Sequence, residues 1–141
     1  PFQALGQNLS FSSNFSGQYG LDTLYGSEQY SIGSLYSVRG FNQSSLSGDS
    51  GYSFKNDLNL NRVYSLSNGP LIARHYVGFD YGRVDNKENS SQVGELAGVS
   101  AGTAFNFKNV ALELIVTQPV LKPNFMKKPD TDFFFSTTVT F

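Results

Sequence analysis

The chain has 141 residues, a net charge of -1 and no cysteine, with 39% hydrophobic and 15% aromatic residues and 14 glycines. This composition favours a single domain rich in strands and turns. The charge argues against a nucleic-acid partner, because phosphate binding needs an excess of basic residues, and the lack of cysteine excludes disulfides and thiolate metal sites. The chain starts at Pro1 and has no run of about 18 apolar residues, so we expect a mature segment or fragment without a transmembrane helix.

Six segments alternate between apolar and polar residues, as expected for strands, and no segment has helical periodicity. In chain order they cover about 5–15, 52–60, 71–83, 97–107, 112–117 and 133–141. The segment 17–51, between the first two, is rich in Gly, Ser, Tyr and Asn. A connection of this length inside a compact domain is usually functional, so we expect the strands to hold this loop for a purpose.

The charged residues inside the predicted strands fall on the less apolar face of each strand: Lys55, Asp57, Arg74, Asp80 and Glu113. That face is otherwise dominated by Ser, Thr, Gly and Asn, while the opposite face is rich in aromatic residues. This pattern indicates an antiparallel transmembrane β-barrel with lipid outside and a wet lumen inside. The alternative is a soluble antiparallel sandwich with one face in water.

The predicted connections also alternate in length. Longer ones, at 17–51, 84–93 and 119–131, alternate with shorter ones at 61–69 and 108–109. Outer-membrane barrels have long extracellular loops and short periplasmic turns, and strands of about 9–11 residues suit a tilted crossing of the bilayer. Six strands cannot close a barrel, since barrels of this class start at about eight. Either copies of this chain assemble together or, as we expect, the chain is the C-terminal part of a larger barrel.

The end of the chain supports this prediction. Apolar residues alternate through the last strand and finish on an aromatic residue, at Phe133, Phe135, Val139 and Phe141. This ending resembles the C-terminal signal by which bacterial outer-membrane proteins are recognised for insertion.

Three motifs stand in and after the long loop. Val38-Arg39-Gly40-Phe41 is followed by Gly48-Asp49-Ser50-Gly51, and the later strand contains Gly78-Phe79-Asp80-Tyr81-Gly82. Together with the terminal Phe141 they resemble the TpsB family, the outer-membrane transporters of two-partner secretion that export and activate haemolysins, adhesins and contact-dependent inhibition toxins. The Val-Arg-Gly-Phe core is shared with the barrel-assembly insertases of the same superfamily, whereas Gly-Asp-Ser-Gly points to TpsB.

The resemblance implies a sixteen-stranded barrel with two periplasmic POTRA domains and a plug helix, of which residues 1–141 would supply the last six strands. It implies a secreted TpsA-type exoprotein as partner, contact with outer-membrane lipid, insertion by the barrel-assembly machinery and no cofactor. The alternatives are an insertase of the same superfamily and a passive porin-like barrel.

The resemblance also assigns roles to single residues. It implies that the loop folds back into the lumen and that Arg39 pairs with Asp80, which has the required inward parity. Arg74 is a second inward cation that would join this network, and Gly78 and Gly82 would leave room for the loop. Asp49 is expected to cap a turn within its own Gly-Asp-Ser-Gly motif.

Two further residues receive no functional role. Asp57 stands in Asn56-Asp57-Leu58, where the family commonly has Glu before Leu, and this departure weakens any role for it. His75 lies on the lipid side by parity and is the single histidine, so a usual zinc site or a Ser-His-Asp triad is not expected. No phosphate-binding glycine loop precedes a helix, and we therefore expect no enzymatic activity.

Overall fold

The computed structural model describes residues 2–4, 7–42, 44–87, 93–127 and 129–141. In this part of the chain the elements are all strands: β1 (Phe2–Ala4), β2 (Gln7–Gln18), β3 (Tyr30–Ile32), β4 (Leu46–Gly48), β5 (Ser50–Leu66), β6 (Gly69–Asp85), β7 (Gly94–Phe107), β8 (Val110–Leu121) and β9 (Asp132–Val139). Seven of them form one sheet in the order β1-β2-β5-β6-β7-β8-β9, and β3 pairs with β4 separately. Within the described residues no helix is both long and apolar enough to cross a membrane.

The predicted all-β architecture is confirmed, and the six predicted strands correspond to β2 and β5–β9. Each strand pairs antiparallel with its neighbour in the sheet. Three short strands were not predicted, β1, β3 and β4, because three residues are too few to show an alternating pattern. Residues 5 and 6, where the first strand was expected to start, lie outside the described part of the chain.

The expected connection at 61–69 is wrong. The ladder between β5 and β6 continues to the pair Leu66 and Gly69, which leaves a turn of two residues. The prediction followed the polar composition of this stretch, but backbone N–H and C=O groups pair whatever the side chains are. β5 and β6 therefore have 17 residues each, more than the 9–11 or so that a tilted crossing of a bilayer needs.

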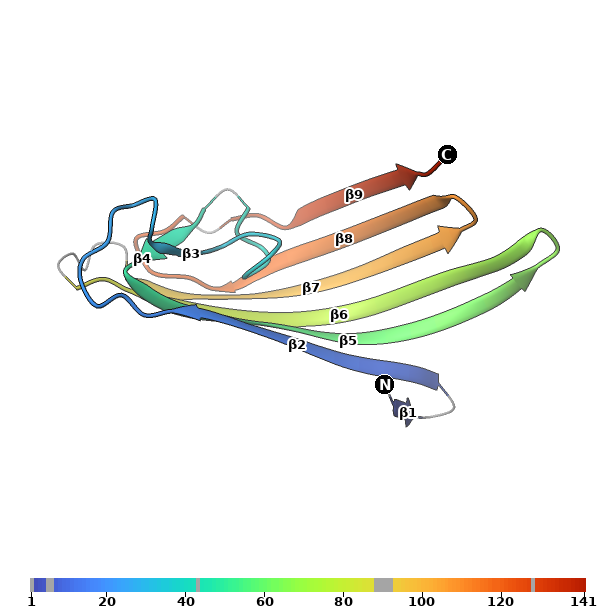
Figure 1. The fold of residues 1–141 in the computed structure, drawn as a ribbon, viewed down its shortest axis with the longest axis horizontal. Helices are drawn as coiled ribbons and strands as arrows, with labels where there is room; N and C mark the ends of the chain where they lie inside the picture. The colour runs from blue at the N-terminus through green and yellow to red at the C-terminus, as the bar shows by residue number, and fades with distance from the viewer. Residues whose placement is uncertain (1, 5–6, 43, 88–92, 128) are drawn as a thin grey trace.

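The connections differ between the two ends of the sheet, as predicted. Two-residue turns join β5 to β6 and β7 to β8 at one end. The second of these turns has Lys108 in the left-handed region, at φ 50°. At the opposite end lie the loop 19–49, with β3 and β4 in it, and the connections that follow β6 and β8 (Figure 1).

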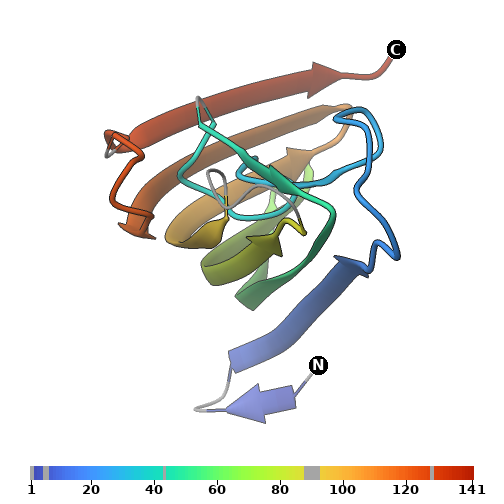
Figure 2. The same cartoon turned by 90° about the vertical axis from the view of Figure 1, so that its left-hand side faces the viewer.

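The sheet is curved, and its two faces differ. Viewed from the loop end, the strands from β2 to β9 follow an open arc, with the loop 19–49 across its hollow (Figure 2). The outer face exposes large apolar side chains, among them Phe11, Phe15, Val77, Phe79, Phe133 and Phe135. In the described residues no second sheet packs against this outer face, so the sandwich alternative is wrong.

Candidate functional site

The loop 19–49 carries its own small apolar core into the hollow of the sheet. The side chains of Val38 and Phe41 are fully buried. They pack in one cluster with Ile32 and Leu46 from the β3–β4 pair and with Val84 and Leu96 from the ends of β6 and β7. Burial of this apolar surface holds the loop against the hollow face. Arg39, the next residue after Val38, is thereby held against β5 and β6.

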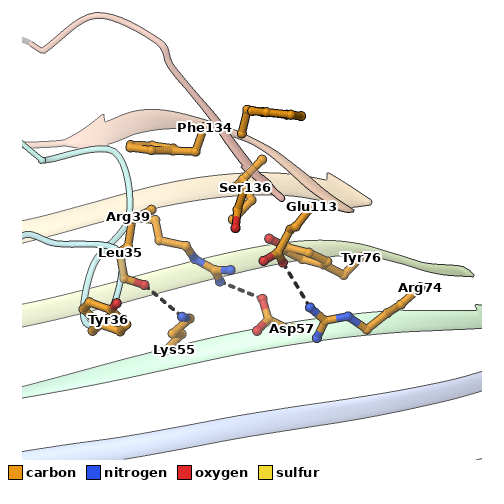
Figure 3. Close-up of a pocket in the computed structure, with 12 residues that line it drawn as sticks. Leu35, Tyr36, Arg39, Lys55, Asp57, Arg74, Tyr76, Glu113, Phe134 and Ser136 are labelled. Carbon is orange, nitrogen blue, oxygen red and sulfur yellow. Dashed lines mark hydrogen bonds and ion pairs between the residues drawn. The ribbon is translucent and has the colours of Figure 1, made fainter. Parts of the chain in front are cut away.

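Arg39 is the centre of the site, and it is bound by two carboxylates. Its backbone N–H and its Nε both donate to Asp80 Oδ2, at 3.1 Å and 2.6 Å, and its Nη2 donates to Asp80 Oδ1 at 2.7 Å. The same Nη2 donates to Asp57 Oδ1 at 2.7 Å (Figure 3). Arg39 is 2% exposed and Asp80 is 0% exposed. This is the planar, forked recognition of a carboxylate to which a guanidinium is suited.

The strand register explains why these carboxylates converge. Lys55 pairs with Asp80 and Asp57 pairs with Gly78, so the two acids lie on adjacent strands, one inward-facing row apart. A Cβ at Gly78 would overlap Arg39 Nη2 and would lie 2.5 Å from Asp57 Oδ1. The missing side chain of Gly78 therefore provides the space that the guanidinium occupies.

Asp57 is the residue whose part in this site the sequence did not indicate. Its departure from the family pattern weighed against it, although its inward parity was visible. Lys55, on the same face, donates from Nζ to the Leu35 carbonyl at 2.9 Å and so contacts the loop as well. Inward parity on the strand next to Asp80 was the signal that could have identified both.

Two other glycines, one on β6 and one in the loop itself, lie where the loop and the sheet are in close contact. A Cβ at Gly82 would lie 3.0 Å from Val38 Cγ2. Gly40 has a φ of 98°, and a Cβ there would lie 2.9 Å from the backbone nitrogen of Pro119 in β8. The loop backbone thus crosses from β6 toward β8 with little room for side chains beneath it.

Arg74 does not bind the same carboxylates. Its Nη2 pairs with Glu113 Oε1 at 3.2 Å, and its side chain is 45% exposed. The guanidinium also lies over the Tyr76 ring, 5.0 Å from the centroid. The expectation that Arg74 joins the Arg39 network needs correction: Arg74 lies on the same face but pairs across to β8 (Figure 3).

A pocket of about 410 Å³ lies between the tip of the loop and this second ion pair. Leu35, Tyr36 and Arg39 line it from the loop, and Glu113, Ile115 and Phe134 line it from β8 and β9. Charged side chains of both signs and aromatic rings are among the groups that line it. Among the described residues no group of three or more His, Asp or Glu side chains could hold a metal ion.

Asp49 does not cap its own turn. Its carboxylate accepts hydrogen bonds from the backbone N–H groups of Leu24 and Lys87 and from the Gln29 side chain, which are remote in sequence. The hydrogen bond from Leu24 and then that from Lys87 hold the pKa of Asp49 below its ordinary value. The cap prediction is wrong because the buried carboxylate finds its donors in other segments. Its motif neighbours Gly48 and Gly51 lie in β4 and β5.

The residues of the predicted insertion signal lie at the edge of the sheet. Phe133, Phe135 and Val139 are exposed on β9, and Phe141 is exposed beyond it.

His75 Nδ1 lies 2.8 Å from Thr103 Oγ1, and its ring packs edge-on against Phe105. No role in chemistry follows from these contacts.

We expect Asp80 to contribute more than Asp57 to the stability of the anchored loop. Replacing Asp80 by Ala removes three of the hydrogen bonds to Arg39 and leaves a buried cation, a loss on the order of 3–5 kcal/mol. Replacing Asp57 by Ala removes one hydrogen bond from a side chain that is 20% exposed, so the loss should be smaller. Trypsin cleavage after Arg39 in the detergent-solubilised full-length protein measures release of the loop. Faster cleavage in Asp57→Ala than in Asp80→Ala would contradict this ranking.

Comparison with known proteins relates this geometry to one family. Residues 1–105 match the family described as haemolysin secretion/activation protein ShlB/FhaC/HecB. The chain is 35% identical to the hemolysin transporter protein HpmB of Proteus mirabilis over 108 residues. These residues make up 77% of this chain and 18% of that protein. It is 29% identical to the outer membrane transporter CdiB of Dickeya dadantii over 132 residues, and this alignment covers 92% of this chain and 23% of that protein.

Solved structures have the same fold. CdiB from Acinetobacter baumannii matches 98% of this chain with a TM-score of 0.83 and 26% identity, over 25% of the length of that protein. CdiB from Escherichia coli matches 93% of this chain with a TM-score of 0.84 and 24% identity, over 24% of its length. The chain therefore spans about a quarter or less of the length of each of these relatives.

Proposed function

Because the chain belongs to the haemolysin secretion/activation protein family ShlB/FhaC/HecB, we propose that it forms part of the barrel through which a partner exoprotein crosses the outer membrane. The partner would be a TpsA-type protein, in keeping with relatives that are named as hemolysin transporters and as CdiB. The chain is an all-β segment of a bacterial outer-membrane protein. Transport itself is a property of the whole protein, of which this chain is a part.

The two faces of the sheet support a barrel wall. The outer face exposes Phe and Val side chains to the hydrocarbon region, and the hollow face presents Ser, Asn and charged groups to a wet lumen. The sheet is open at β1 and β9, and free strand edges are not tolerated in lipid. Strands outside residues 1–141 would close it, in keeping with a sixteen-stranded barrel with two POTRA domains.

The orientation follows from the connections. Outer-membrane barrels have short turns on the periplasmic side and long loops on the outside. The end that carries the loop 19–49 is therefore extracellular, and the two-residue turns are periplasmic. The outward-facing aromatic residues of β9 would present the C-terminal signal to the barrel-assembly machinery.

Inside the lumen, the loop 19–49 would act as a conformational element that controls the conduit. The observation that carries this proposal is the buried Arg39 guanidinium, bound at once by Asp80 and Asp57. A buried charge bound by two carboxylates is costly to separate, so the anchored state is well defined. The pocket beside the loop tip would contact the unfolded partner as it passes.

A disulfide across the lumen tests whether the loop must move. A Cβ at Gly82 lies 3.0 Å from Val38 Cγ2, and the sequence contains no cysteine, so Val38→Cys with Gly82→Cys gives a pair within bonding reach. We expect oxidation to lower secretion of the partner by the full-length protein at least tenfold and reductant to restore it. Each single cysteine variant serves as its control. Full secretion with the disulfide formed would show that the loop stays in place during transport.

A further inference from the structure

The loop 19–49 is held at a second point, close to where it re-enters the sheet and separate from Arg39. Asp49 is 1% exposed, and both of its carboxylate oxygens are used. Oδ1 accepts from Leu24 N at 2.8 Å and from Gln29 Nε2 at 3.2 Å, while Oδ2 accepts from Lys87 N at 3.0 Å. One side chain therefore satisfies backbone donors in two different segments: the start of the loop and the segment that follows β6.

Asn86 makes the reciprocal contacts. Its Oδ1 accepts from the backbone N–H of Asp49 at 3.0 Å, and its Nδ2 donates to the carbonyl of Ser47 at 3.4 Å. The Lys87 ammonium, next in the chain, also contacts the Leu21 carbonyl. The segment after β6 and the loop 19–49 thus exchange side-chain to backbone hydrogen bonds in both directions.

The backbones pack closely around Asp49. A Cβ at Gly20 would lie 2.6 Å from the Asp49 carbonyl oxygen. A Cβ at Gly48 would lie 2.8 Å from the carbonyl oxygen of Asp85, at the end of β6. The atoms that such a Cβ would meet belong to the backbone, which cannot rotate away as a side chain does, so glycine is needed at both positions for this close approach.

We propose that Asp49 is a positioning residue that joins the extracellular segment after β6 to the loop 19–49, so that the two become ordered together. This inference does not depend on the Arg39 anchor and goes beyond the proposed role of that anchor. An ionised carboxylate is required because it accepts on both oxygens. An asparagine of the same shape would direct an amide N–H at Leu24 N or at Lys87 N and would lose the hydrogen bond to that donor.

Hydrogen exchange in the full-length protein in detergent tests the proposal. In Asp49→Asn, we expect peptides covering 20–29 and 84–87 both to exchange at least tenfold faster than in the wild type. Peptides covering 36–42, which contain Arg39, should keep their protection. Asp22→Asn, an exposed acid in the same loop, is the matched control and should leave all three regions unchanged.

A second variant tests the same contact between the two segments from the side of Asn86. Asn86→Ala removes the acceptor for Asp49 N and should also accelerate exchange in the loop 19–49, at 46–49, as well as at 84–87. If exchange is faster in only one of the two segments in both variants, the proposal is overturned. A loss of protection at 36–42 in Asp49→Asn would overturn it as well, because Asp49 would then support the whole loop rather than join two segments.

Discussion

Replacing Arg39 by alanine in the full-length protein is expected to reduce secretion of the partner exoprotein at least tenfold while the barrel remains folded. The substitution leaves Asp80 buried without its cation and removes the side-chain hydrogen bonds from Arg39 to Asp80 on β6 and to Asp57 on β5. Removing one partner of a buried ion pair costs on the order of 3–5 kcal/mol, because it strands the other charge. The cost falls on the anchored loop, so its population inside the lumen should drop.

The measurement is export of the partner into the medium, with heat-modifiable migration of the protein on gels as the check that the barrel has formed. Arg39→Lys tests the fork itself: one ammonium cannot serve both Asp80 oxygens and Asp57 with the same geometry, so an intermediate level of secretion is expected. Arg83→Ala is the matched control, because it removes an arginine of β6 whose pairs with Asp85 and Glu95 are partly exposed and contribute little, and which lies outside the Arg39 site and its pocket. Normal secretion by a folded Arg39→Ala protein would remove the proposed role of the anchor.

Strand parity predicted much of the fold and part of the site. Alternation placed Asp80 and Asp57 on the inward face, and the resemblance carried by Val38-Arg39-Gly40-Phe41 suggested the partner for Arg39. These features are readable because a period of two fixes which face each residue occupies once the strand is recognised. The ends of β5 and β6 were not predicted, because their polar tips resemble a loop in composition while the backbone ladder continues.

The contacts of Asp49 could not be predicted from the sequence, for a different reason. Its donors are Leu24, Gln29 and Lys87, which are 20 to 38 residues away along the chain. No local pattern encodes which distant N–H group a carboxylate will meet, whereas a turn cap is a local interaction and is therefore the prediction that sequence favours. Arg74 shows the same limit, since parity gives the face of a side chain but not its choice of partner.

Gly98 gives a test of loop seating that leaves every charged residue in place. This glycine lies on β7 at the irregularity in its pairing with β8, and a Cβ there would overlap the carbonyl oxygen of Arg39 and lie 3.0 Å from its carbonyl carbon. Both are backbone atoms, so Gly98→Ala can be accommodated only by moving the loop or bending the strand. Overpacking of this kind typically costs about 1–3 kcal/mol.

We therefore expect Gly98→Ala to resemble Arg39→Ala in secretion and to expose the Arg39 bond to trypsin, although Arg39, Asp57 and Asp80 are all intact. Gly102→Ala is the matched control on the same strand and face, because the atoms nearest its Cβ would be the ring and hydroxyl of Tyr76, a side chain, rather than the backbone of the loop. If both variants lose secretion equally, β7 is sensitive to any added side chain and the loop is not singled out. If Gly98→Ala secretes normally with Arg39 still protected, the loop does not cross β7 at this glycine. Loss in Gly98→Ala alone would assign the defect to the position of the loop rather than to its charge.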